Sequence, residues 1–181
     1  MMSQKLSVKQ KKWWVIVHLT FMILWFSGLL GTILLAALTT SMTNRELVYA
    51  AHSFIESFDH FLVIPGAIGC LLTGIWMSIR TNWGLTKYYW IIIKLIGNIG
   101  VILVGSTIIR SLIIQTNTLS TANQVNPLQN PAYIDARQMF ILGSTTLLTV
   151  LFFLVIVSII KPWGKRKGEN RNQVSDKIRT D

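Results

Sequence analysis

Residues 13–38 read WWVIVHLTFMILWFSGLLGTILLAAL, a stretch of 26 residues without Asp, Glu, Lys or Arg. A helix rises by about 1.5 Å per residue, so a helix of this length exceeds the roughly 30 Å hydrocarbon layer of a bilayer. A basic segment precedes the stretch, and the paired Trp13 and Trp14 are expected at the lipid headgroups, where amphipathic rings are favoured. The stretch therefore predicts a first transmembrane helix, which stays in the mature protein.

Three further apolar stretches predict spans at about 47–79, 88–114 and 138–160. Of the 181 residues, 51% are hydrophobic and 13% are charged, whereas about a quarter of the residues of a soluble domain are charged. The predicted fold class is all-α, a polytopic membrane protein built as a four-transmembrane-helix bundle. Pro65 lacks a backbone donor, so the second span is one long helix kinked there or two helices joined there.

The segments outside the spans are polar. A basic N-terminus covers residues 1–12, a turn is expected at Arg80–Lys87, and Gln115–Ile134 contains prolines, asparagines and threonines that predict a surface loop. Residues 161–181 form a basic tail with too little apolar surface to fold, and disorder is predicted for them.

The distribution of Lys and Arg predicts the orientation. Thirteen of the 17 lie in the N-terminal segment, the 80–87 turn and the tail, whereas only Arg45 and Arg137 flank the spans on the other side. The positive-inside rule places both chain ends in the cytoplasm (N-in/C-in). The membrane expected is the cell membrane, here a bacterial plasma membrane. The net charge of +10 thus indicates contact with membrane lipids and not with nucleic acid. A second copy or another membrane protein is the remaining partner expected.

Small residues recur at helical spacing in two spans. Gly66, Cys70 and Gly74 are four residues apart in the second span, and Ser27 and Gly31 are four apart in the first. Such stripes let helix backbones approach closely in lipid. They predict packing faces, with Cys70, the single cysteine, as a small packing residue.

Ionisable residues inside spans cost about 2.5 to 3.5 kcal/mol each on insertion scales, so they need partners or a polar cavity. His18 and Lys94 each lie about 7 to 9 Å beyond the cytoplasmic start of their spans, which predicts one inner polar level. His18 is a candidate ligand of b-type haem, a proton carrier or a histidine bonded to a neighbouring helix. Lys94 either reaches back to the headgroups or points inward to an anionic group such as a propionate or a lipid phosphate.

An outer polar level is expected where the second span enters from the other face. Glu56, Asp59 and His60 cluster there, and Arg110 lies near the corresponding end of the third span. The pairing of Arg110 with Asp59 or Glu56 satisfies both charges. Lys94 and Arg110 are separated by about 160° around a regular helix, so we expect them to face different neighbours.

His52, Glu56 and His60 repeat every four residues and would share one helical face. Two histidines and a carboxylate can bind a transition metal such as zinc, which makes the three a candidate metal site. The alternative is a polar stripe satisfied by water and by Arg110 and Arg137.

Several short motifs suggest a family. The chain resembles small bacterial four-helix integral membrane proteins known only as a domain of unknown function, and the resemblance covers roughly residues 13–114. It is carried by His18, Trp25, Gly28, Asp59, His60, Pro65, Gly66, Ala67, the run Leu72–Trp76, the run Asn82–Leu85, Trp90 and Lys94.

The same pattern is distantly similar to HemJ-type protoporphyrinogen oxidase and to the membrane domain of the copper-resistance protein CopD. This similarity implies functional roles for His18 and Lys94 as cofactor-binding residues, although HemJ-type proteins carry a further His where this chain has Asn98. The leading hypothesis is a membrane-embedded redox or haem-binding protein. The alternatives are a small transporter or ion-translocating protein with an outer gate of Glu56, Asp59, His60 and Arg110, and a structural or accessory membrane subunit. No particular enzyme activity is predicted.

Overall fold

A computed structural model describes residues 7–80, 88–121 and 127–160. Within these ranges the protein is all-α. Four helical segments are long and apolar enough to cross a membrane, and they cover Val8–Leu38, Arg45–Arg80, Tyr89–Thr121 and Pro131–Ile160. The chain is therefore a multi-pass integral membrane protein. The N-terminal residues 1–6, the turn after Arg80 and the tail at 161–181 lie outside the described residues.

The second and third segments each contain a π-helical turn. The successive elements are α1 (Val8–Leu38), α2 (Arg45–Phe58), η1 (Asp59–Val63), α3 (Ile64–Arg80), α4 (Tyr89–Val104), η2 (Gly105–Ile109), α5 (Arg110–Thr121), η3 (Pro127–Gln129) and α6 (Pro131–Ile160). Both η1 and η2 are π-helical, and η3 is a short 3₁₀ turn.

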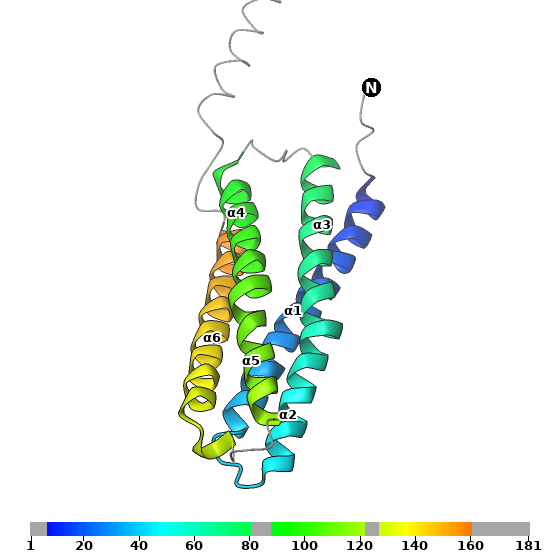
Figure 1. The fold of residues 1–181 in the computed structure, drawn as a ribbon. Helices are drawn as coiled ribbons and strands as arrows, with labels where there is room; N and C mark the ends of the chain where they lie inside the picture. The colour runs from blue at the N-terminus through cyan, green and yellow to red at the C-terminus, as the bar shows by residue number, and fades with distance from the viewer. Residues whose placement is uncertain (1–6, 81–87, 122–126, 161–181) are drawn as a thin grey trace, which may run out of the picture.

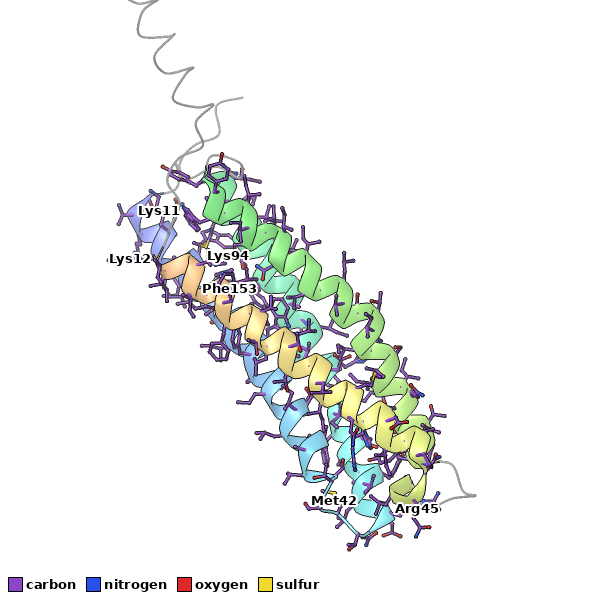
Figure 2. All side chains as sticks on the ribbon, turned by 90° about the vertical axis from the view of Figure 1, so that its left-hand side faces the viewer. Lys11, Lys12, Met42, Arg45, Lys94 and Phe153 are labelled. Atoms are coloured by element: carbon purple, nitrogen blue, oxygen red, sulfur yellow. The ribbon has the colours of Figure 1, made fainter. Side chains whose placement is uncertain are left out.

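The segments run alternately up and down as a bundle, so that α1 begins and α6 ends at one end of the molecule (Figure 1). We call this the termini end and the other the loop end. Around the bundle α1 packs against α3 and α6, and α4 packs against α6, while α3 and α4 meet through fewer contacts. In Figure 2, Lys11 and Lys12 mark the termini end and Met42 and Arg45 mark the loop end.

The helices extend beyond the apolar stretches because local capping favours it. Ser7 and Gln10 form a capping box at the start of α1. Asn44 caps α2, and Asn130 accepts a hydrogen bond from the backbone N–H of Ala132 at the start of α6. Most of the loop expected between residues 115 and 134 is therefore helical, since α5 continues to Thr121 and α6 begins at Pro131.

The second segment is one continuous helix, and the π turn η1 sits immediately before Pro65. The Ile64 N–H bonds to the Asp59 carbonyl, five residues back. A π turn inserts one extra residue into the helix and changes which face the later residues occupy. The proline thus follows a change of helical register, and the alternative of two separate helices joined at Pro65 is wrong.

Along the predicted small-residue stripe, the distance between α1 and α3 is short at Gly66 and longer at Gly74. At Gly66 an added Cβ would lie 2.6 Å from the backbone nitrogen of Trp25, so α1 and α3 are in close backbone contact there. At Gly74 an added Cβ would lie 3.4 Å from His18 Cε1, an ordinary contact. Since the same stripe is tight at Gly66 and loose two turns later, the two helices diverge toward the termini end.

Candidate functional site

A cavity of about 370 Å³ occupies the centre of the bundle near the termini end, and we call it the lysine cavity. All four long segments contribute to its wall, which is mostly aliphatic and aromatic. The polar or sulfur-bearing side chains that line it are His18, Cys70, Ser78, Lys94, Asn98 and Ser158, with two methionines, Met22 and Met77. A mainly apolar cavity with a few convergent polar groups is the usual form of a small-molecule site.

Lys94 is half-buried and lines the lysine cavity. Its Nζ donates to the Ser158 hydroxyl at 3.1 Å, and Figure 2 shows Lys94 in the half of the bundle nearer Lys11 and Lys12. Among the described residues Lys94 has no carboxylate within ion-pair distance. Ser158 lies in the last turn of α6, whose terminal carbonyls supply only partial negative charge. The ammonium charge is therefore left largely uncompensated by this part of the chain.

Asn98 lies one helical turn from Lys94 on α4 and also lines the cavity. The residue is buried, with 7% of its surface exposed. Its side-chain amide makes no hydrogen bond to another residue in the described ranges, and its polar atoms are not fully enclosed. Lys94 and Asn98 thus present a cation and a free amide to the same space.

His18 is held against α3 by both of its ring nitrogens. The Thr73 hydroxyl donates to the Gly69 carbonyl at 2.6 Å, so its oxygen accepts from His18 Nδ1 at 2.7 Å. The other nitrogen, Nε2, lies 4.0 Å from Cys70 Sγ. His18 therefore anchors α1 to α3 and contributes its ring to the wall of the lysine cavity.

This arrangement does not fit an axial haem ligand. An iron on Nε2 needs open space on that side of the ring for the porphyrin plane. Here Cys70 Sγ lies 4.0 Å from Nε2, and the space for a single added Cβ at Gly74 borders Cε1. The haem prediction for His18 is thus not supported, because the edge of the ring that would carry the iron is packed on α3.

A second central cavity of about 180 Å³ lies nearer the loop end, and we call it the arginine cavity. Asp59 and Arg110 line it, and Arg110 Nη1 lies 2.7 Å from Asp59 Oδ2. The ion pair expected from the sequence is therefore present. Asp59 is the first residue of η1 and Arg110 immediately follows η2, so each partner is positioned by a π turn, a feature frequent at functional sites.

The π turn η2 also brings Arg110 to the interior. On a regular helix Lys94 and Arg110 would differ by about 160°, but one inserted residue reduces the difference to about 60°. Both side chains accordingly line central cavities of the same bundle. They nevertheless face different neighbours, as expected, because Lys94 bonds Ser158 of α6 and Arg110 pairs with Asp59 of η1.

The candidate metal triad is not brought together. His52 is fully buried and its Nε2 lies 2.8 Å from the Tyr133 hydroxyl, while Glu56 accepts a hydrogen bond from Asn117 at 2.7 Å. His60 lies within η1 and is exposed, because the π turn rotates it off the face of the other two. Across the ranges that the structure describes, no three His, Cys, Asp or Glu residues are placed to hold a metal ion.

Sequence reasoning assigned no cavity role to three lining residues, Cys70, Asn98 and Ser158, or to Thr73, which holds His18. Asn98 and Ser158 were visible as polar residues inside apolar spans, and the four-residue interval between Lys94 and Asn98 was a usable signal. Cys70 and Thr73 were assigned to packing or not considered, and only the packing of α1 on α3 shows that they hold His18.

No protein-family model, curated protein or solved structure matches the chain. The resemblance to a family of small bacterial membrane proteins is therefore not confirmed, and the site has to be interpreted from its own geometry.

Proposed function

We propose that this membrane protein binds an amphipathic anion in the lysine cavity, and that Lys94 and Asn98 bind the anionic head of this ligand. The observation that carries the proposal is the ammonium group of Lys94, which lines an apolar cavity and has Ser158 as its hydrogen-bond partner within the described ranges. A charge inside a transmembrane bundle needs a counterpart, and a bound anion supplies one.

The chemistry of the wall defines the ligand class. A carboxylate, sulfonate or phosphate group accepts charge-assisted hydrogen bonds from an ammonium group and further bonds from an amide. The remaining lining residues, such as Leu19, Leu71 and Ile91, are apolar and suit a hydrocarbon or aromatic body. The proposed ligand thus has one anionic head and an apolar remainder, as fatty acids and phospholipids do.

The distribution of basic residues supports a location of this site in the cytoplasmic half of the membrane. With N-in/C-in orientation, the termini end faces the cytoplasm and the lysine cavity lies in the cytoplasmic half of the membrane. A ligand would then enter from the cytoplasmic leaflet or from the adjacent headgroup region. Labelling of single cysteines introduced at the two ends tests this orientation.

Binding of radiolabelled octanesulfonate to the full chain in phosphatidylcholine nanodiscs tests the proposal. This probe is permanently charged and carries a short alkyl chain. We expect Lys94→Met to weaken binding by about tenfold or more, equivalent to about 1.4 kcal/mol, because the charged partner is removed. Lys94→Arg should retain most of the binding.

Lys12→Met is the matched control, since Lys12 is exposed near the termini end and does not line the cavity. It should bind as the wild type does. Equal binding by the wild type and Lys94→Met would contradict the proposal. Repeating the titration in phosphatidylglycerol nanodiscs distinguishes the ligand source, because competition there indicates that a lipid phosphate occupies the cavity.

A redox role for His18, which the resemblance implies, is the second candidate function. The contact between His18 Nε2 and Cys70 Sγ at 4.0 Å is the observation that favours chemistry at this histidine, as a proton carrier beside a thiol. An absorption spectrum of the purified protein with metal analysis tests it. A spectrum without a Soret band and a sample without stoichiometric metal would leave anion binding as the function.

A further inference from the structure

We infer that the lysine and arginine cavities are successive sites on one pathway through the bundle, along which the protein transports the amphipathic anion. This inference rests on the proposed function, since it takes the same ligand, and it adds translocation to binding. It arises from the relative placement of the two cavities, which share all four helical segments as walls.

The two cavities follow one another along the bundle axis. They are about one helical turn apart on α1, α3 and α4, and about two turns apart on α6, between Leu147 and Val155. On α1 the lining changes from Met22 to Trp25, and on α4 it changes from Asn98 to Val101. On α3 the lining changes between Cys70 and Ala67 in the same direction. One turn of a helix rises about 5.4 Å, so the partition is thin compared with the membrane.

Two leucines of α6 form this partition. Leu151 and Leu154 are buried in the core and line neither cavity, although the α6 residues on both sides of them do. Leu154 packs on Gly97, where an added Cβ would lie 2.7 Å from Leu154 Cδ2. The barrier between the cavities therefore consists of flexible apolar side chains and not of backbone.

Each cavity contains one cation, and the two cations belong to the same helical segment. Lys94 and Arg110 are sixteen residues apart, which corresponds to about 24 Å along the axis. An anion leaving Lys94 toward the loop end would next meet Arg110. Asp59 occupies Arg110 in the structure, so an incoming anion has to displace one carboxylate from a guanidinium group.

This exchange explains why a carboxylate is present in one cavity only. The pair of Asp59 and Arg110 keeps the arginine cavity neutral without a ligand. A competing anion that pairs with Arg110 leaves the buried Asp59 carboxylate without its partner, which favours the return of Asp59 and the release of the anion. The aliphatic and aromatic remainder of that cavity, including Trp25 and Phe140, suits the body of the same ligand. The two cavities thus differ as anion sites, because an anion meets a cation without a carboxylate partner at Lys94 and has to displace Asp59 at Arg110.

Flux of radiolabelled octanesulfonate into phosphatidylcholine proteoliposomes tests the inference, alongside binding in nanodiscs. The main variant is the double substitution Asp59→Asn with Arg110→Gln, which keeps a hydrogen-bonding pair and removes both charges. We expect its flux to fall by about tenfold or more, while binding in the lysine cavity stays near the wild-type level. Unchanged flux in this variant would overturn the inference.

Widening the partition gives an independent measurement. Leu154→Ala should raise flux several-fold by joining the cavities, whereas Leu142→Ala on the exposed face of α6 should not. Gel filtration shows whether each variant is folded. If Leu154→Ala is folded and its flux equals that of the wild type, the partition is not on the pathway and the inference fails.

The two levels of the hypothesis are separable. Wild-type protein that binds octanesulfonate without transporting it refutes the pathway and leaves the proposed function intact. Wild-type protein that neither binds nor transports the probe refutes both. Transport that is lost in Lys94→Met and in the Asp59 and Arg110 double variant, with binding lost only in the former, supports both.

Discussion

The lysine and arginine cavities are built from the same four helical segments, yet they treat a buried cation in opposite ways. Arg110 meets Asp59 at 2.7 Å, whereas the hydrogen-bond partner of Lys94 in the described ranges is the hydroxyl of Ser158. Because a charge in a membrane bundle must be compensated, the arginine cavity is complete as it stands, whereas the lysine cavity needs the ligand that we propose for it. On this interpretation the charge of Arg110 stabilises the fold, and the charge of Lys94 serves the proposed ligand binding.

The largest expected effect comes from breaking the compensated site. Asp59→Ala leaves Arg110 without its carboxylate and should lower the free energy of unfolding by about 3 kcal/mol, the lower part of the range for buried pairs because 32% of the Arg110 side chain is exposed. Unfolding by sodium dodecyl sulfate in mixed micelles measures the change.

Lys94→Met is the counterpart in the other cavity. It removes a cation that has no carboxylate partner in the described ranges, so the free energy of unfolding should not decrease in the absence of ligand. A loss comparable to that of Asp59→Ala would mean that Lys94 is also paired in the folded protein, and the contrast between the cavities would disappear.

A smaller effect should distinguish the tight and open parts of the α1 and α3 contact. Gly66→Ala forces a methyl group against the backbone of Trp25 and should cost about 1 to 3 kcal/mol. Gly74→Ala meets His18 at an ordinary distance and should cost less than about 1 kcal/mol. Thermal unfolding in detergent compares the two variants, and equal midpoints would contradict the divergence of the helices.

A further small effect concerns two threonines, Thr73, which holds His18, and Thr32, which lines the arginine cavity. Thr73→Val removes the acceptor of His18 Nδ1 and should cost about 1 kcal/mol. Thr32 lines the arginine cavity and bonds only the Leu29 carbonyl of its own helix, so Thr32→Val should be nearly neutral. Thermal unfolding again measures both, and a larger loss for Thr32→Val would show that His18 does not depend on Thr73.

Pair predictions made from depth along the helices proved more useful than predictions made from helical face. The depth argument placed Asp59 with Arg110 and His18 with Lys94, and the structure has the first two in an ion pair and the second two in one cavity wall. The face argument held for Lys94 and Arg110, which contact α6 and η1 respectively. It failed for His60, which lies within the π turn η1 and is exposed whereas His52 is buried.

The sequence alone determined that the chain crosses a membrane with four helices, because long runs without charge can satisfy their backbone groups in lipid only as helices. It also indicated which ionisable residues need a partner or a polar cavity, since the free-energy cost of placing a charge in hydrocarbon arises in any fold. Tertiary structure decided which of these residues are compensated within the chain. Compensation depends on contacts between side chains from different helices, such as Asp59 with Arg110, and on π turns that a hydropathy pattern does not reveal.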